Sequence, residues 1–242
     1  MLIPDVPLPP GVRAAVTTRD LAGFSRAPFG RFNLGAHCGD APEAVAANRE
    51  RLMELLELPG RPLWLRQVHG TGVVDAEALP ADAEPEADAA ITREPGRVLA
   101  VLTADCLPVI FAACDGSVIG VAHAGWRGLA AGVLEATLSR MAVDPVQVIA
   151  WLGPSIGAAS YEVGSEVRDA FLACVPSAAD AFTATRPGHW RCDLPAIARR
   201  RLHMAGLRRV DGGSFDTCAD PRFHSYRRDR HTGRFATLVW RP

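Results

Sequence analysis

The sequence lacks any apolar run that approaches the ~18 residues needed to cross a bilayer. Its N-terminal end is Pro-rich, without the basic start and apolar stretch of a secretion signal, so we expect a cytoplasmic protein that does not enter membranes. It also lacks an excess of charge, because 26 Lys and Arg stand against 27 Asp and Glu, a net charge of −1. That balance gives no general attraction to nucleic acid.

Paired metal-ligand motifs are missing as well. The six Cys form no Cys-x-x-Cys pair and the seven His form no His-x-His pair. The first absence disfavours a structural zinc site with paired Cys, and we expect reduced thiols. The second disfavours a multinuclear copper centre, which gathers many His ligands. No internal repeat, heptad pattern or low-complexity tail is visible, so we expect one domain over residues 1–242, with a monomer favoured.

What is present is an ordinary enzyme composition, 48% hydrophobic and 22% charged, with mixed helix and strand patterns. Asp40 is expected to cap a helix that continues to about residue 58, where Pro59 and Gly60 end it. We expect further helices over residues 130–141, 164–175 and 194–205, a surface loop over residues 79–90, and strands over residues 13–18, 62–69, 97–103, 107–112, 118–123, 146–152 and 235–240.

The close succession of strands decides the expected fold class. The turn Cys114-Asp115-Gly116-Ser117 joins two apolar runs and favours an antiparallel pair. A parallel crossover would need about a dozen residues or more, and these connections are too short. We therefore predict an α+β fold, a single domain of mixed β-sheets flanked by outer helices in an α/β/β/α-like arrangement.

Three segments each place a metal-competent side chain at or near the end of an expected strand. They supply His69, Cys106 and His123. Two imidazoles and one thiolate suit zinc, and three protein ligands leave a fourth position for water or substrate. Copper could occupy the same site, since Cu²⁺ outcompetes Zn²⁺ at many N/S sites. The pattern alone leaves another interpretation open, in which the Cys is simply buried and both His are hydrogen-bonded.

Charged residues near these segments could bind phosphate or carry a proton. Arg66 and Arg127 lie close to His69 and His123, and a guanidinium matches phosphate in a bidentate fork. Either Arg could instead be a surface charge or half of an ion pair. Asp105, next to Cys106, is a candidate proton carrier, although it could equally form a turn.

The same segments carry a resemblance that runs nearly end to end. The sequence resembles the YfiH family, also called the laccase-domain or "polyphenol oxidase" family. The matching segments are Thr17-Thr18-Arg19, Asn33-Leu34-Gly35-Ala36-His37-Cys38-Gly39-Asp40, Gln67-Val68-His69-Gly70, Thr103-Ala104-Asp105-Cys106-Leu107-Pro108, His123-Ala124-Gly125-Trp126-Arg127-Gly128, Trp151-Leu152-Gly153-Pro154 and Ser225-Tyr226-Arg227-Arg228-Asp229. One departure is His224, where relatives often carry an aromatic residue.

The resemblance implies a zinc-dependent purine nucleoside phosphorylase with adenosine deaminase side activity. Such an enzyme would convert adenosine, inosine and methylthioadenosine into free base and ribose 1-phosphate, with nucleoside and phosphate as its small-molecule partners. The zinc ligands of the family fall on His69, Cys106 and His123. We assign Cys106, Asp105, Arg66 and Arg127 to catalysis, and Arg19, His37, Gln67 and Arg227 to substrate contacts; all but Arg66 lie within the matching segments, and Arg66 directly precedes one.

Other functions stay open at this point. Cys106 and His123 could form a nucleophile–base pair in a cysteine hydrolase or a peptidoglycan-precursor editing enzyme. Copper-dependent polyphenol oxidation is a further alternative. A non-enzymatic protein that uses zinc for structure is the last, and the open three-ligand set argues against it.

Overall fold

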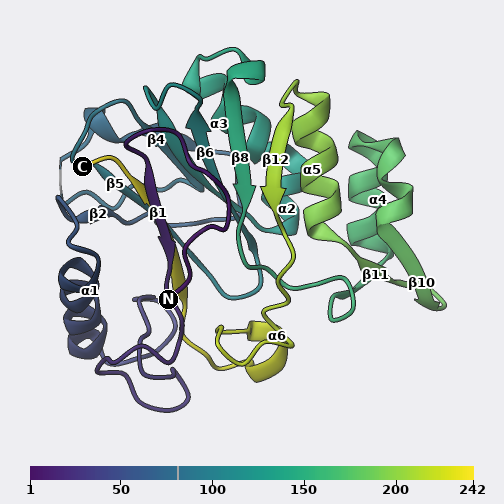
Figure 1. The fold of residues 1–242 in the computed structure, drawn as a ribbon. Helices are drawn as coiled ribbons and strands as arrows, with labels where there is room; N and C mark the ends of the chain where they lie inside the picture. The colour runs from purple at the N-terminus through teal and green to yellow at the C-terminus, as the bar shows by residue number, and fades with distance from the viewer. Residues whose placement is uncertain (81) are drawn as a thin grey trace.

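The computed structural model describes residues 1–80 and 82–242, and two mixed β-sheets form its centre (Figure 1). The larger sheet has six strands, in the order β12 (Arg209–Gly212), β8 (Val148–Leu152), β6 (Leu107–Ala113), β7 (Ile119–Ala124), β4 (Ala89–Thr92) and β3 (Val73–Asp75). The four inner strands pair antiparallel, and the two edge strands add in parallel. The antiparallel pairing of β6 with β7 confirms the predicted hairpin.

The second sheet has four strands, in the order β1 (Arg13–Val16), β13 (Phe235–Trp240), β5 (Val98–Thr103) and β2 (Pro62–Leu63). Only β2 is parallel to its neighbour. A small antiparallel sheet of β10 (Phe182–Arg186), β11 (His189–Cys192) and β9 (Glu162–Gly164) lies to the right in Figure 1.

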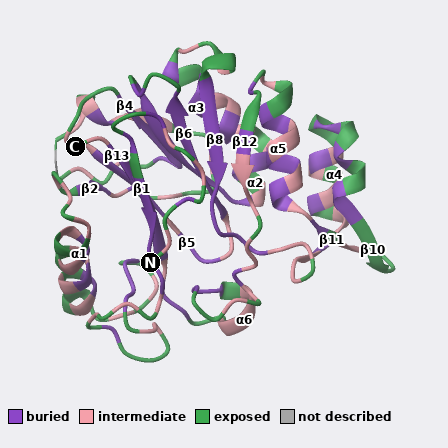
Figure 2. Cartoon of the chain, viewed as in Figure 1, coloured by how far each residue is buried: buried purple, intermediate pink, exposed green. Residues whose placement is uncertain are grey.

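Alternating side chains of the central strands explain the layers. In β6, Val109 and Phe111 enter the core beneath the outer helices, whereas Ile110 enters the core between the two sheets. In β5, Leu99 belongs to the core between the sheets and Ala100 to the core on the opposite face. Because both faces of these strands are buried, they are continuous apolar runs (Figure 2).

Helices cover the outer faces of both sheets. Apolar residues of α2 (Trp126–Ala131), α3 (Val133–Met141), α4 (Ser165–Cys174) and α5 (Leu194–Met204) pack over the six-stranded sheet. Leu52 of α1 (Pro42–Leu56) packs on the four-stranded sheet. The predicted α+β fold with α/β/β/α layers is thereby confirmed. The remaining helical elements are η1 (Ala76–Ala78), η2 (Pro145–Gln147), η3 (Pro176–Ala181) and α6 (Tyr226–Asp229).

None of the helices in the described residues combines the length and apolarity that a membrane crossing requires. The strand expected over residues 62–69 is wrong beyond Leu63. Beyond Leu63 the segment makes one isolated bridge, between Arg66 and Glu86, and otherwise bonds its surroundings through side chains. The amide of Gln67 bonds both the N–H and the C=O of Leu102, at 2.8 and 2.9 Å, and the carboxylate of Asp88 binds the following turn.

The boundaries predicted for two helices are also partly wrong. Asp40 does not cap α1, because its carboxylate accepts hydrogen bonds from Ser25 and Asn33, and Ala41 stands at the cap position. The helix expected over residues 130–141 is two helices, α2 and α3, divided at Gly132, which adopts a φ of 103° that favours glycine.

The end of the expected loop over residues 79–90 is wrong too, since β4 begins at Ala89 and is wholly buried. Ala81 within that loop lies outside the described residues.

Candidate metal centre

His69, Cys106 and His123 converge from three separate parts of the chain. Cys106 lies in the tight connection between β5 and β6, His123 lies near the end of β7, and His69 belongs to an irregular turn after β2. Their ligand atoms all lie within 4.8 Å of one another. Sγ of Cys106 is 3.8 Å from Nε2 of His69, close to the roughly 3.5 Å between ligand atoms on tetrahedral zinc. The donor set therefore fits one metal ion.

Asp88 organises both histidines, and the sequence analysis missed it. Its carboxylate accepts hydrogen bonds from Nδ1 of His123 at 2.8 Å and from the backbone N–H of His69 at 2.9 Å. It also accepts from the N–H groups of Val68 and Gly70, at 3.2 and 2.7 Å. A carboxylate can only accept, so the proton of His123 resides on Nδ1 and Nε2 is left for a metal. The one available signal was an acid directly before the apolar strand β4.

Gly125 lets the ligands approach each other. A Cβ at this position would lie 2.7 Å from Cδ2 of His69 and 3.1 Å from Sγ of Cys106. Both distances are shorter than ordinary van der Waals contact, so a side chain at residue 125 would displace the ligands. The Gly of the His123-Ala124-Gly125 segment is therefore part of the site.

The three side chains favour a thiolate beside an imidazolium when no metal is bound. Burial would raise the pKa of the Cys106 thiol, but the charge of His123 and hydrogen bonds from both histidines lower it. Burial would lower the pKa of His123, but the Cys106 thiolate and the Asp88 carboxylate raise it. A metal ion would replace the proton in such a pair.

The ligands line one cavity of about 370 Å³, called here the metal-facing cavity. His123 is only 3% exposed, whereas His69 is open to solvent. The cavity size is within the range of small-molecule sites. His37 and Gln67, two of the predicted substrate contacts, also line it.

The four arginines predicted for the site do not line this cavity. Arg66 pairs with Glu86 at 2.6 Å, and Arg19 pairs with Asp229 at 3.1 Å. Arg127 is exposed and stacks on Trp126, 4.4 Å from the ring centroid. The side chain of Arg227 lies over Tyr161 and lines a second cavity, of about 450 Å³.

Asp105 has a φ of 93°, and its carboxylate is already bonded. It accepts hydrogen bonds from the hydroxyl of Thr217 at 2.7 Å and from the backbone N–H of Arg227 at 2.7 Å. These contacts attach the segment around α6 to the residue beside Cys106. A structural role for Asp105 thus accounts for both carboxylate oxygens.

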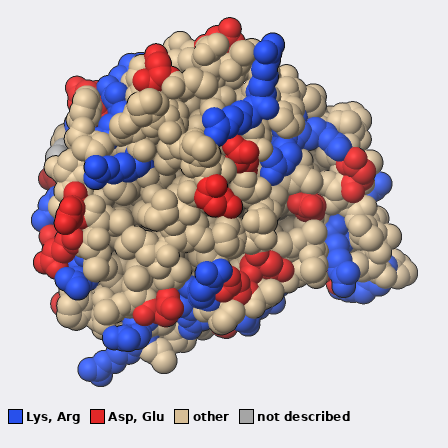
Figure 3. Space-filling model, in the orientation of Figure 1, with Lys and Arg blue, Asp and Glu red and all other residues tan. Residues whose placement is uncertain are grey.

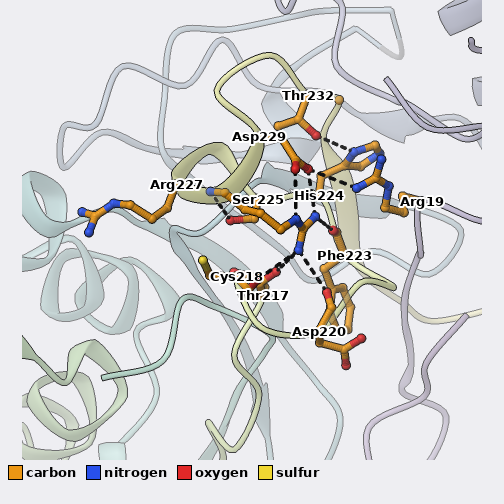
Figure 4. Close-up of polar contacts among 12 residues, drawn as sticks. Arg19, Thr217, Cys218, Asp220, Phe223, His224, Ser225, Arg227, Asp229 and Thr232 are labelled. Carbon is orange, nitrogen blue, oxygen red and sulfur yellow. Dashed lines mark hydrogen bonds and ion pairs between the residues drawn. The ribbon is translucent and has the colours of Figure 1, made fainter. Parts of the chain in front are cut away.

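The α6 segment is itself held by Arg228 (Figure 4). Its guanidinium donates to the carbonyl groups of Thr217, Cys218 and Phe223 and to the carboxylate of Asp229. The side chain of Arg227 points away from this cluster in Figure 4. The side chains of Arg227 and Arg228, adjacent in one motif, therefore contact different parts of the molecule.

Comparison with known proteins agrees with this architecture. A family model described as "Multi-copper polyphenol oxidoreductase laccase" matches residues 13–242. The chain is 46% identical to "Purine nucleoside phosphorylase YfiH" of Escherichia coli K12, over 99% of this chain and 98% of that protein. The chain belongs to the YfiH family.

Other relatives are also similar along nearly their whole length. A "Purine nucleoside phosphorylase" of Xylella fastidiosa strain Temecula1 is 54% identical, over 99% of this chain and 96% of that protein. The crystal structure of Neisseria meningitidis protein NMB0706 superposes with a TM-score of 0.94 at 45% identity, covering 99% of this chain and 98% of that one. The YfiH-family fold is therefore shared in full.

Proposed function

We propose that this YfiH-family chain is a zinc-dependent purine nucleoside phosphorylase acting on adenosine, inosine and methylthioadenosine, with adenosine deamination as a side activity. The observation that carries the proposal is the convergence of His69, Cys106 and His123 on the metal-facing cavity. The names of the relatives supply the reaction class.

Phosphorolysis exchanges one bond at the anomeric carbon of the ribose. The C1′–N bond to the purine breaks, an oxygen of phosphate bonds to C1′, and the departing base takes the electron pair and then a proton. A zinc ion held by these three residues would supply a Lewis acid and a water molecule that ionises near neutral pH. The buried Asp88–His123 pair keeps the ligands oriented.

Zinc is favoured over a multinuclear copper centre by the number of ligands. Within residues 1–80 and 82–242, the side chains that could hold a metal ion form one group, and it has three members. Two imidazoles and a thiolate satisfy a single tetrahedral ion with one open position. Copper bound at the same three residues would account for incidental oxidase chemistry.

A small-molecule substrate suits the surface as well as the cavity. On the face shown in Figure 3, basic and acidic side chains are interspersed rather than gathered by sign. This face offers no extended positive field for a nucleic acid. We propose a monomer that works on nucleoside and phosphate.

A second candidate is favoured by one specific contact. His123 lies between Cys106 and Asp88, and the order nucleophile, base and orienting carboxylate is that of a cysteine hydrolase. The lowered pKa of the Cys106 thiol fits that role too, because His123 stabilises the thiolate against the effect of burial. Such an enzyme would cleave an amide or ester, for example in a cell-wall precursor.

Product analysis separates the two candidates. Zinc-loaded protein is incubated with adenosine or inosine, with and without phosphate, beside a Cys106→Ala variant and protein stripped by a chelator. Phosphate-dependent release of free base that chelation abolishes and zinc restores supports the phosphorylase. Hydrolysis of an amide or ester substrate, assayed in parallel, that survives chelation but not Cys106→Ala assigns a cysteine hydrolase. No conversion of nucleosides by folded, zinc-loaded protein refutes the phosphorylase.

A further inference from the structure

Two arginines that the sequence did not single out line the metal-facing cavity. They are Arg49 of α1 and Arg234, which directly precedes β13. The cavity that holds His69, Cys106 and His123 therefore has two cations on its walls. Both come from segments far apart in the sequence.

The backbone of Leu34 forms hydrogen bonds with both arginines. The Nε–H of Arg49 donates to the carbonyl oxygen of Leu34 at 3.1 Å. The N–H of Leu34 donates to the carbonyl oxygen of Arg234 at 3.1 Å. The neighbouring Gly35 packs against the stem of Arg234, where a Cβ would lie 2.7 Å from Cγ. The turn around Leu34 thus contacts both arginines, at the guanidinium of Arg49 and at the backbone and stem of Arg234.

Neither arginine forms an ion pair within the part of the chain that the structure describes. The ion pairs found there include Arg19 and Arg66, but neither Arg49 nor Arg234 is in one. Arg49 lies against the face of Trp64, 4.3 Å from the ring centroid. One terminal nitrogen of Arg234 donates to the carbonyl groups of Thr232 and Gly233.

Donors therefore remain for a ligand. Among the described residues, both terminal nitrogens of Arg49 and one of Arg234 have no hydrogen-bond acceptor. Arg49 is partly desolvated, and burial lowers the pKa of its guanidinium, while the charge of Glu84 raises it. A half-buried arginine without a carboxylate partner is stabilised by an anion, and two of them offer bidentate contacts.

We propose that Arg49 and Arg234 form the phosphate subsite of the metal-facing cavity and hold the inorganic phosphate dianion that attacks the ribose. This inference rests on the proposed phosphorolysis. It replaces Arg66 and Arg127 as the phosphate-binding pair. Glu84 lines the same cavity, and its carboxylate opposes the bound anion.

The test compares the zinc-loaded full-length protein with the Arg49→Met and Arg234→Met variants. Arg51→Met is the matched control, because Arg51 lies on the same helix and pairs with Glu54. The KM for phosphate at saturating inosine should rise about tenfold or more in both test variants, with a change of about threefold or less in the KM for inosine. Arg51→Met should leave both values unchanged, and Glu84→Gln should lower the KM for phosphate.

A binding measurement separates failure of this inference from failure of the proposed function. Line broadening of the ³¹P resonance of inorganic phosphate reports binding without turnover, and thermal unfolding shows that each variant is folded. If nucleosides are not converted, phosphate binding that both variants lose still supports the subsite. If a variant does not fold, Arg49→Lys or Arg234→Lys, which keeps the charge but not the bidentate fork, takes its place, with the same weakening expected.

Three outcomes would overturn the inference. The first is a KM and binding of phosphate that stay within about twofold of the parent in both Met variants. The second is a parent protein that binds no phosphate. The third is loss of adenosine monophosphate binding alone, which would assign the arginines to a nucleotide phosphate instead.

Discussion

The carboxylate of Asp88 accepts a hydrogen bond from Nδ1 of His123 at 2.8 Å, and the two side chains are 0% and 3% exposed. The same carboxylate holds the turn that carries His69. Asp88 therefore connects two of the three candidate metal ligands, although no atom of its own side chain belongs to the ligand group.

Replacement of Asp88 by Asn should weaken zinc binding by about 10- to 100-fold, the usual effect of removing a partner that orients a metal-bound His. An Asn side chain keeps one acceptor oxygen but cannot satisfy all four N–H groups. Competition with a chromogenic chelator measures the affinity. Asp144→Asn, which changes a carboxylate that accepts from Val146 on the surface, should bind zinc like the parent. Unchanged affinity in Asp88→Asn would show that the contact is not needed for binding.

Substitution of Gly125 by Ala should damage the site through shape alone. The new methyl group would overlap His69 and Cys106, and overpacking of this kind costs about 1–3 kcal/mol. We expect a lower midpoint of thermal unfolding and weaker zinc binding. Gly72→Ala is the control, because its nearest neighbour would lie at 3.6 Å, an ordinary contact. Equal zinc affinity in the two variants would contradict the close-approach interpretation.

Asp105 can be tested as a proton carrier against its role in positioning α6. Asn can accept from the N–H of Arg227 and donate to the hydroxyl of Thr217, so Asp105→Asn retains both contacts. If Asp105 positions the segment, this variant keeps kcat/KM within about tenfold, whereas Asp105→Ala loses more. A proton carrier would instead lose about 10²- to 10⁴-fold in both variants, with one limb of the pH profile removed.

His224 should make the protein sensitive to acid. It is 0% exposed, and burial, together with the charges of Arg19 and Arg234, lowers the pKa of its imidazole from 6.5 to about 3. Between these two values the unfolded chain binds more protons than the folded one, so stability falls as the pH drops through this window.

The aromatic variant His224→Phe should remove that dependence. The difference in the free energy of unfolding between parent and variant should shift by about 2 kcal/mol against the parent between pH 7 and pH 5. Denaturant titrations at the two pH values measure it, and the comparison cancels the acid response of the metal ligands. A constant difference would mean that His224 takes up a proton without unfolding.

The placement of the metal-competent residues at strand ends was visible in the sequence. Apolar runs at close spacing predicted β5, β6 and β7, and the ends of two of these strands deliver Cys106 and His123. The layered α+β fold followed from the same runs, because short connections exclude parallel crossovers.

Polar contacts between residues far apart in the sequence could not be predicted from it. Asp88 lies 35 residues from His123 along the chain, inside a stretch rich in Pro and acids that resembles a surface loop. Arg66 looked suited to phosphate, yet a bridge between Arg66 and Glu86 places its guanidinium against a carboxylate. Periodicity reports which face of an element is buried, not which charged group lies opposite.

The sequence by itself determined the alternation of buried strands and helices, the fold class and the chemical types of three candidate ligands. Only the tertiary structure decided that Asp88 orients two of them and that Gly125 leaves room for His69 and Cys106. It also decided that Arg49 and Arg234, rather than Arg66 and Arg127, line the cavity. The physical reason is how far apart in the sequence the interacting groups lie. Apolar burial is encoded locally in the pattern of side chains, whereas hydrogen bonds and ion pairs act over a few ångströms between groups that only the folded chain brings together.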